Sequence, residues 1–332
     1  MTRPLVSISM LTYNHAPYIA RAIEGVLQQK TTFLFELVIG EDCSTDNTSE
    51  IISEYHKKHP DIIRVITSDE NIGATRNGIR TLKACQGKYL AFCEGDDYWH
   101  HPYKLQKQAD YLEHHEDCGL VYSSYDVYHI KFKTLIKDFI RYRKWEMPEI
   151  PSMLDIIEGR GEPLTCTVML RRTLCEQIIE SDAYLHQSGH FLMGDTQLWA
   201  EMATKARLYY IPESLATYNN ITEESATRSR DVNKGLRFSI SAAELRIYLC
   251  NKYNLPRWLK DKHEQYFDEC SLKLAFHSRS EELANEVGRR KKTFTFEEWL
   301  LYYGAKSSIA HYFLRIAVLF RNRLRKSHSQ WQ

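Results

Sequence analysis

The sequence lacks an excess of charge of either sign. Its 332 residues include 44 Lys and Arg against 43 Asp and Glu, which gives a formal net charge of +1. Binding along a nucleic-acid backbone needs concentrated Lys and Arg side chains that neutralise phosphates. We therefore expect no nucleic-acid partner. A hydrophobic content of 43% is ordinary for a globular enzyme.

Paired cysteines and long apolar runs are also missing. The eight cysteines are scattered, and none stands at the C-x-x-C spacing of a zinc or redox motif. No uninterrupted apolar segment is long enough to cross a bilayer. The first residues lack the apolar stretch of a signal peptide. These absences predict a reduced, cytoplasmic protein.

The first half of the chain alternates between strand and helix patterns. Apolar runs predict strands at residues 5–12, 35–40, 62–66 and 88–93, with amphipathic helices between them. This order is typical of an α/β protein with a mostly parallel sheet flanked by helices. From about residue 231 the pattern is almost entirely helical. We place a boundary near residue 225, between an α/β domain over residues 1–225 and a helical C-terminal region over 226–332.

The pattern is less regular between residues 128 and 225. Residues 131–144 are rich in basic and aromatic side chains and form either a loop or an extra helix. We expect a strand at 164–171, a helix at 195–204, and a pair of short strands at 208–211 and 214–218.

Polar clusters follow three of the predicted strands. They span residues 12–14, 41–46 and 94–97, each at the C-terminal end of a strand. Ligands of open parallel sheets bind beyond this end of the strands. We therefore expect the three clusters to converge in one cleft, although they are far apart in sequence.

The most acidic cluster contains Glu94, Asp96 and Asp97. Carboxylates so close together repel one another unless a cation or dipoles compensate. Hard oxygen ligands suit Mg²⁺ or Mn²⁺, which share their coordination with waters and phosphates. A solvated acidic turn ahead of the next helix is the alternative, because D-x-D spacing alone is a weak signal.

Five motifs together resemble glycosyltransferase family 2, a group of inverting enzymes with the Rossmann-like GT-A fold. They are VSISMLTYN (6–14), ELVIGEDCSTDNT (36–48), NIGATRN (71–77), GKYLAFCEGDDYW (87–99) and GDTQLW (194–199). Their order and spacing match the family over about residues 4–220. The resemblance implies a metal-dependent transferase of the hexosyltransferase type. Its donor would be a nucleotide sugar, its cofactor Mn²⁺ or Mg²⁺, and its acceptor a glycan or a lipid-linked saccharide of cell-surface polysaccharide synthesis.

The resemblance also implies roles for single residues. Six match positions that surround the nucleotide: Thr12, Tyr13, Asn14, Glu41, Asp42 and Arg76. Asp42 matches the carboxylate that accepts a hydrogen bond from the base, and Glu41 stands where the family usually has Asp. Arg76 matches a basic residue of the nucleotide pocket, with capping of an acidic loop as the alternative.

Glu94, Asp96 and Asp97 match the D-x-D motif and the acid after it, with Glu in place of the first Asp. The resemblance implies that Asp96 holds the metal, and that Glu94 or Asp97 faces the ribose or the metal. Asp195 matches the general base. It also directly precedes an amphipathic stretch as a helix N-cap does, and one residue can fill both roles. Trp199 is a core or acceptor-platform residue.

The implied reaction is a single displacement that inverts the anomeric centre, with UDP favoured as the nucleotide. Asp195 takes the proton of the acceptor hydroxyl that attacks C1 of the sugar.

Two alternatives remain open. A sugar-nucleotide pyrophosphorylase would carry a glycine-rich phosphate loop after the first strand, and residues 12–17 contain no glycine. A catalytically decayed GT-A scaffold is consistent with the departures from the family pattern at Glu94, Gly194 and Asn219. The joint retention of Asp42, Asp96, Asp97 and Asp195 argues against decay.

The last residues predict an amphipathic helix. Apolar residues from Ile309 to Leu324 fall on one stripe, and basic residues from Arg315 to Lys326 flank it. Such a helix either lies on an anionic membrane surface or packs on the core with its basic face in water. The first alternative implies peripheral attachment to the inner face of the cell membrane.

Overall fold

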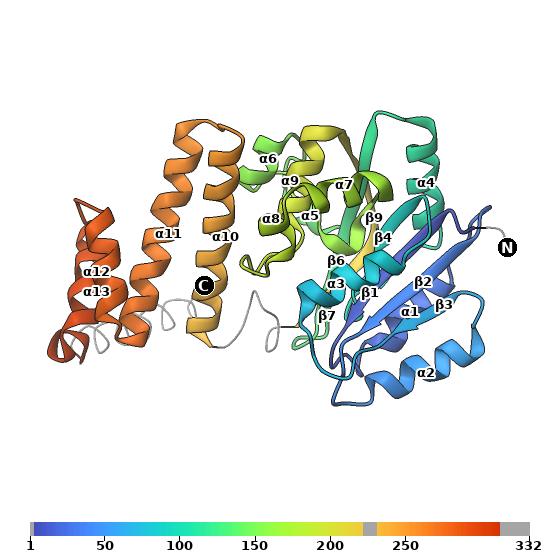
Figure 1. The fold of residues 1–332 in the computed structure, drawn as a ribbon, viewed down its shortest axis with the longest axis horizontal. Coiled ribbons are helices and arrows are strands. Elements are labelled where there is room, and N and C mark those ends of the chain that lie inside the picture. Colours follow the sequence, from blue (N-terminus) through green and yellow to red (C-terminus); the bar gives the residue numbers. More distant parts are fainter. Residues whose placement is uncertain (1–2, 222–230, 313–332) are drawn as a thin grey trace, which may run out of the picture. The chain divides into compact units, whose positions relative to one another are not determined.

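The computed structural model describes residues 3–221 and 231–312. It contains two compact units, the first ending at Ile221 and the second following it. The boundary that we predicted near residue 225 falls among residues 222–230, outside the described part. Figure 1 shows the elements of both units.

The first unit is built around one sheet with the strand order β3-β2-β1-β4-β8-β6-β9-β5, in which β7 also pairs with β6. The strands are β1 (Val6–Thr12), β2 (Phe35–Glu41), β3 (Ile63–Ile66), β4 (Tyr89–Phe92), β5 (Tyr98–Trp99), β6 (Cys118–His129), β7 (Thr134–Ile136), β8 (Met169–Arg171) and β9 (Arg207–Asn220). The first four in space, β3 to β4, are parallel, as are β6 and β9, whereas β8 and β5 run antiparallel to their neighbours. The predicted mostly parallel sheet flanked by helices is confirmed, and the antiparallel strands make it a mixed sheet (Figure 1).

Ten helical segments of the first unit are described. They are α1 (Ile19–Leu27), α2 (Thr48–Lys58), α3 (Ala74–Ala84), α4 (Lys104–His114), α5 (Phe139–Tyr142), α6 (Met153–Glu158), the 3₁₀ turn η1 (Thr165–Thr167), α7 (Arg172–Ser181), α8 (Ala183–Gln187) and α9 (Thr196–Lys205). The predicted helix at 195–204 is thus confirmed as α9.

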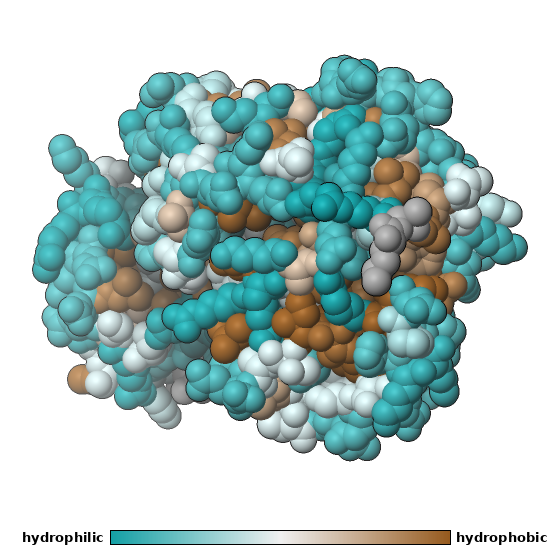
Figure 2. All heavy atoms as spheres, turned by 45° about the vertical axis from the view of Figure 1, so that its right-hand side comes forward, coloured by the Kyte–Doolittle hydropathy of each residue, from teal (hydrophilic) through white to brown (hydrophobic). Residues whose placement is uncertain are grey.

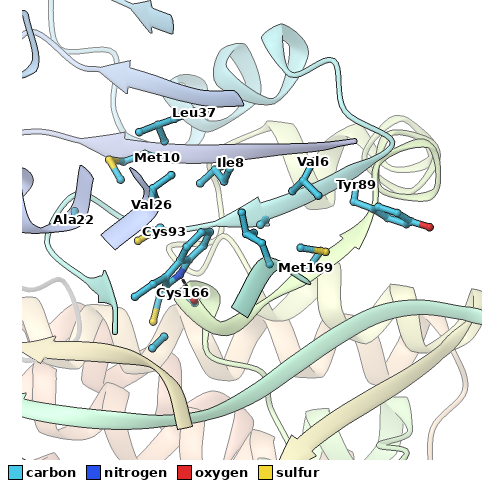
Figure 3. Packing of buried hydrophobic residues seen from close by; sticks show 14 of the residues in the cluster. Val6, Ile8, Met10, Ala22, Val26, Leu37, Tyr89, Cys93, Cys166 and Met169 are labelled. Carbon is cyan, nitrogen blue, oxygen red and sulfur yellow. Dashed lines mark hydrogen bonds between the residues drawn. The ribbon is translucent and has the colours of Figure 1, made fainter. Parts of the chain in front are cut away.

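The main core lies between the sheet and α1, α2 and α4. Val6, Ile8 and Met10 alternate along β1, so all three side chains point to the same face, toward Ala22 and Val26 of α1 (Figure 3). Each fully buried side chain of this size contributes about 1.5–3 kcal/mol relative to exposure. This packing fixes β1, and with it the residues that follow the strand.

The opposite face of β1 and β2 carries α3. Gly40 permits this close approach, because a Cβ atom there would lie 2.1 Å from Oγ1 of Thr81 and 2.7 Å from Oδ1 of Asn77. The amide of Asn77 also donates a hydrogen bond to the Gly40 carbonyl at 2.8 Å. The first residues of α3 are therefore held near the C-terminal end of β2.

Two predicted elements were wrong. Residues 208–211 and 214–218 do not form a pair of strands, because both belong to β9 and run along β6. The register shifts between Ile211 and Ser214, where Pro212 lacks the N–H that a regular ladder needs. The predicted strand at 164–171 is reduced to Met169–Arg171, since Thr165–Thr167 form a 3₁₀ turn. Residues 131–144 contain both a strand, β7, and a short helix, α5.

The second unit is helical, as the pattern from residue 231 predicts. Its helices are α10 (Val232–Lys252), α11 (Arg257–Ser278), α12 (Glu281–Arg290) and α13 (Phe296–Lys306). α11 packs against the other three, with Ala275, Ala284 and Ala305 at a common centre. The amphipathic helix that we predicted over residues 309–326 lies outside the described residues from 313 onward. Among the residues that are described, no helix has the length and hydropathy needed to cross a membrane.

Hydrophilic residues cover most of the face drawn in Figure 2, and hydrophobic residues reach the surface between them. Some large apolar side chains of the first unit are well exposed, among them Tyr13, Phe132, Tyr142 and Trp145. Isolated exposed apolar residues are normal, but a group of them marks a contact surface.

Candidate active site

The loops after β1 and β2 are joined to each other. The N–H of Asn14 donates to Oγ of Ser44 at 3.0 Å, and Oδ1 of Asn14 accepts from the N–H of Thr45 at 2.8 Å. The next residue, His15, donates its N–H to Oγ1 of Thr48 at 2.8 Å. Asn14 has a φ of +56°, a conformation that Asn adopts more readily than most residues. Asn14 therefore joins the loop after β1 to the loop after β2. These are two of the loops in which we predicted nucleotide-binding residues.

Asp42 fixes a third loop, the one after β3. Its buried carboxylate accepts the N–H of Ile72 at 3.0 Å and that of Gly73 at 2.9 Å. Gly73 has a φ of +83°, which residues with a side chain rarely adopt. A carboxylate has about four lone-pair sites, so Asp42 retains acceptor capacity. The neighbouring Glu41 instead accepts the N–H of Ser44 at 2.7 Å and closes its own loop.

A basic residue does face Asp42, but it is Arg80 rather than Arg76. Nη2 of Arg80 lies 3.9 Å from Oδ1 of Asp42 and donates to the Glu41 carbonyl at 2.6 Å. Arg76 lies one turn earlier on α3 and is exposed. The guanidinium of Arg76 is therefore accessible at the edge of these loops.

The acidic loop after β4 rests on the end of β1. The N–H of Gly95 donates to the Leu11 carbonyl at 2.9 Å. A Cβ on Gly95 would lie 2.9 Å from both Cβ of Thr12 and Nδ1 of His15, so only glycine allows this approach. These contacts confirm the predicted convergence of the clusters at 12–14, 41–46 and 94–97. In the described part of the chain, the buried Oγ1 of Thr12 and Nδ1 of His15 have no hydrogen-bond partner.

The two aspartates of the acidic loop have different surroundings. Asp97 is buried, and its Oδ1 accepts the N–H of Asn219 on β9 at 2.8 Å. The side-chain amide of Asn219 also binds the carbonyl of Asp96. The carboxylate of Asp96 is 29% exposed and lies 3.9 Å from Nε2 of His15. Asp96 is therefore the more available ligand.

Burial and repulsion between the carboxylates raise the pKa values of Glu94 and Asp97. Burial, followed by the charge of Asp96, raises the pKa of Glu94 to about 8. Burial and the charges of Asp96 and Glu94 raise the pKa of Asp97 well above its ordinary value, and the hydrogen bond from Asn219 opposes this. Oε2 of Glu94 is buried and has no partner among the described residues. The site thus has an excess of negative charge that a cation would relieve.

These residues fit a divalent metal ion. They offer hard carboxylate oxygens, one of them unpaired, as Mg²⁺ and Mn²⁺ prefer. Within residues 3–221 and 231–312, no three His, Cys, Asp or Glu side chains converge as a complete metal cage. An ion that takes its remaining ligands from water and phosphate does not need such a cage.

Asp195 lies next to this acidic loop. Its negative charge contributes to the raised pKa of Glu94. Asp195 is the N-cap residue of α9, as the sequence predicts, and its Oδ1 accepts the N–H of Thr196 at 2.8 Å. Oδ2 accepts the hydroxyl of Thr165 at 2.6 Å. The carboxylate is therefore oriented by two donors while it remains half-buried.

The turn η1 connects Asp195 with the acidic loop. Thr165 holds Asp195, and the thiol of the next residue, Cys166, interacts with Asp97. The Cys166 carbonyl also accepts the indole N–H of Trp99 at 2.8 Å, which anchors the turn to β5. One short turn therefore sets the positions of both acidic elements.

Sequence reasoning missed four residues of this site: His15, Arg80, Thr165 and Asn219. Two of them carried a signal. Arg80 stands four residues after Arg76, on the same face of α3, and His15 directly follows the predicted Asn14. The contacts of Thr165 and Asn219 join residues far apart in sequence, so no local sequence pattern predicts them. Trp199, expected in the core or on an acceptor platform, is a core residue, 1% exposed and packed edge-on against Phe92.

Curated proteins are similar in sequence to part of this chain. TuaG of Bacillus subtilis, which is named as a teichuronic acid biosynthesis glycosyltransferase, is 34% identical over 125 residues. That match covers 38% of this chain and 48% of TuaG. The chain spans 34% to 48% of the length of three of the curated relatives that it matches, TuaG among them.

Two solved structures share the fold over most of the chain. TarS of Staphylococcus aureus in complex with UDP-GlcNAc has a TM-score of 0.55 at 19% identity, covering 90% of this chain and 79% of TarS. The mannosyltransferase PcManGT of Pyrobaculum calidifontis, in complex with GDP-Man and Mn²⁺, has a TM-score of 0.55 at 15% identity, covering 94% of this chain and 87% of PcManGT. Both are GT-A glycosyltransferases, so the predicted GT-A fold is confirmed.

The family model described as "Glycosyl transferase family 2" matches residues 7–178. This range contains the loops after β1, β2, β3 and β4 and the turn η1. The matched range is just over half of the 332 residues. Four of the five motifs that suggested the resemblance overlap this range. The chain belongs to glycosyl transferase family 2.

Proposed function

We propose that the chain is an inverting, metal-dependent glycosyltransferase. It transfers a sugar from a nucleoside-diphosphate donor, with UDP favoured, to a hydroxyl of a glycan or lipid-linked saccharide. The observation that carries the proposal is the position of Asp195, held by two hydrogen-bond donors beside the acidic loop. Family membership supports the reaction class, and the UDP-GlcNAc and GDP-Man complexes of the structural relatives support a nucleotide-sugar donor.

The donor nucleotide would bind over the ends of β1 and β2. Tyr13 has an exposed ring on which a base can stack, and the buried hydroxyl of Thr12 has no partner among the described residues. Asp42 keeps acceptor capacity for an N–H of the base. The exposed cation of Arg76 on the first turn of α3 suits the diphosphate. The resemblance to the family also places these four residues around the nucleotide.

The acidic loop would hold the divalent ion through Asp96, with Asp97 behind it and Glu94 toward the ribose. When bound, such an ion neutralises the negative charge of the diphosphate leaving group. Asp97 keeps the loop in place through its hydrogen bond with Asn219. The half-buried carboxylate of Asp96 remains available for a ligand.

Asp195 would act as the general base. The N–H of Thr196 and the hydroxyl of Thr165 fix the direction of its carboxylate. An acceptor hydroxyl next to Asp195 gives up its proton as its oxygen attacks C1 of the donor sugar. The bond to the diphosphate breaks on the opposite side, so the anomeric configuration inverts.

Calorimetric binding of UDP, GDP and dTDP, with and without Mn²⁺, tests the donor site. We expect Mn²⁺-dependent binding of UDP in preference to the other two, and a loss of at least about tenfold in Asp96→Asn because one charged contact is removed. Asp110→Asn, on the exposed face of α4, is the matched control and should bind as the unmodified chain does. Absence of binding for all three nucleotides would favour the catalytically decayed scaffold instead.

Turnover tests the base. Asp195→Asn should bind UDP normally and lose transfer by about 10²- to 10⁴-fold, the usual contribution of a general base. Hydrolysis of the donor sugar by water serves as the assay where the acceptor is unidentified, with Asp110→Asn again as the control. Undiminished turnover in Asp195→Asn would remove Asp195 from this role.

A further inference from the structure

A cationic surface lies in residues 130–145, which we name the basic hairpin. It comprises β7, α5 and the residues on either side of them. Six exposed basic side chains belong to it: Lys131, Lys133, Lys137, Arg141, Arg143 and Lys144. No ion pair among the described residues includes any of the six. The cationic charge of the hairpin is therefore available to a partner.

The single acid of the hairpin, Asp138, is used internally. Its Oδ1 accepts the hydroxyl of Ser124 on β6 at 2.5 Å and the N–H of Arg141 at 3.4 Å. Its own N–H donates to Oδ1 of Asp126 at 2.8 Å. Asp126 also accepts the hydroxyl of Ser214 on β9. These bonds fasten α5 to the sheet and leave the outer surface of the hairpin positively charged.

Aromatic rings lie among these cations. Phe139 packs on Tyr125 of β6 with 5.8 Å between ring centroids, and Trp145 meets Phe139 edge-on at 5.7 Å. Tyr142 is 64% exposed and Trp145 48% exposed. The guanidinium of Arg143 lies 5.4 Å from the Trp145 ring. Flat exposed rings offer apolar area to the C–H faces of sugar rings, and the cations beside them offer contacts to negative groups.

The hairpin continues directly into the candidate active site. β7 pairs with the end of β6, where Thr134 lies opposite His129. Nδ1 of His129 lies 2.8 Å from Nδ2 of Asn220. The preceding residue, Asn219, holds Asp96 and Asp97 in place. A chain bound along the hairpin therefore lies next to the acidic loop.

We propose that the basic hairpin binds an anionic glycan acceptor, a saccharide chain that carries carboxylate or phosphate groups. This inference rests on the proposed transfer reaction for its role, but the binding itself does not depend on it. The combination of exposed rings and unpaired cations fits charged sugars better than neutral ones. A lipid surface fits less well, because α5 spans only Phe139–Tyr142 and offers no continuous amphipathic face to bury.

Binding of oligogalacturonide to the full chain tests the proposal, with the fully methyl-esterified oligosaccharide as the uncharged probe of the same backbone. We expect the carboxylate form to bind at least about tenfold more tightly at low salt. The triple variant Lys133→Gln/Lys137→Gln/Arg143→Gln should lose about tenfold of that affinity, since it removes three surface charges. Trp145→Ala should weaken binding of both probes, and Trp145→Phe should restore most of it.

The matched control is Lys57→Gln/Lys58→Gln/Lys83→Gln, three exposed lysines near the ends of α2 and α3. It should bind oligogalacturonide as the unmodified chain does. An equal loss in this control, or equal affinity for both probes, would overturn the proposal. So would binding to phosphatidylglycerol vesicles that needs the same three hairpin cations while oligogalacturonide does not bind. UDP binding, measured alongside, should be unchanged in every variant. If UDP does not bind but the glycan results hold, the donor-site proposal fails and this one stands.

Discussion

Lys104 is a buried lysine beneath the acidic loop. Its Nζ donates to Oε1 of Gln108 at 2.7 Å and lies 4.2 Å from the Trp99 ring centroid. Burial lowers the pKa of Lys104 from its ordinary value of 10.5 to about 7. Between these two values the unfolded chain binds more protons than the folded one, so stability rises with pH across this range. The cost of burying Lys104 is therefore largest below pH 7 and declines as the pH rises toward 10.

We predict that Lys104→Met stabilises the fold at pH 6 by about 1–4 kcal/mol, as replacement of buried charges by apolar residues often does. The advantage should shrink by about 1–3 kcal/mol at pH 9 because the unmodified chain gains stability there. Denaturant unfolding at both values measures it. Lys107→Met, on the exposed face of the same helix, should change stability by less than about 1 kcal/mol at either pH. An advantage that is constant or grows with pH would contradict the assigned pKa.

Gly95 is the residue that lets the acidic loop lie on β1. A Cβ there would lie 2.9 Å from atoms of Thr12, His15 and Ile19, so Gly95→Ala must displace the loop. We expect a loss of about 1–3 kcal/mol of stability from overpacking and a clear weakening of UDP binding. Thermal unfolding and calorimetry measure the two effects.

The control for Gly95 is Gly235 of α10, where an added Cβ meets nothing within 4 Å. Gly235→Ala should stabilise the fold by about 0.5–1 kcal/mol, since Gly is unfavourable inside a helix. UDP binding should not change in this variant. If Gly95→Ala binds UDP as tightly as Gly235→Ala does, the loop does not need the close approach.

At the scale of elements, η1 positions the proposed base. Removal of the Thr165 hydroxyl leaves Asp195 with one donor instead of two. We predict that Thr165→Val binds UDP normally and that its turnover falls by about tenfold, the equivalent of one hydrogen bond. Steady-state kinetics should place the loss in kcat rather than KM. Thr204→Val, on the exposed C-terminal turn of α9, should have unchanged kinetics. Equal kcat in the two variants would show that Thr165 does not position Asp195.

The sequence predicted elements well where apolar residues repeat with a regular period. The strands β1 and β2 lie within one residue of their predicted bounds, because each buries one face or both. We predicted two strands in place of β9, because a proline such as Pro212 usually interrupts a strand. Its pairing with β6 on both sides of Pro212 spans about 90 residues of sequence separation and keeps it one strand. We predicted strand at the position of η1, since a turn of three residues is too short to show a hydrophobic period of its own.

For the whole molecule, the rule that polar loops meet at the C-terminal ends of parallel strands was sufficient to bring three clusters together. It could not separate Asp96 from Asp97, because the difference arises from Asn219, more than 120 residues away. It also could not show that Arg80, rather than Arg76, faces Asp42, since the two lie one turn apart on the same face of α3 and the contact depends on which turn packs beside Asp42. Motifs locate a site, and tertiary contacts decide which atom faces the ligand.

The reactivity of the cysteines measures how accessible the core and the candidate site are to a reagent. All eight are free, and only Cys43 is not buried. Burial raises the pKa of the others, for example that of Cys85 to about 12 and that of Cys118 to about 11. Since the thiolate is the reactive form, we predict that a thiol reagent at pH 8 modifies one cysteine of the native chain quickly and all eight after denaturation. Peptide mapping should assign the fast one to Cys43.

Cys43 directly follows Asp42, in the loop that closes over Glu41. If a nucleoside diphosphate binds over β1 and β2 as proposed, it covers this loop and slows the modification. We expect UDP with Mn²⁺ to reduce the rate at Cys43 severalfold in the unmodified chain and to have no effect in Asp96→Asn. Fast modification at Cys93 or Cys166 in the native chain would mean that the acidic loop opens in solution. A rate at Cys43 that UDP does not change, in a chain that calorimetry shows to bind UDP, would place the nucleotide elsewhere on the molecule.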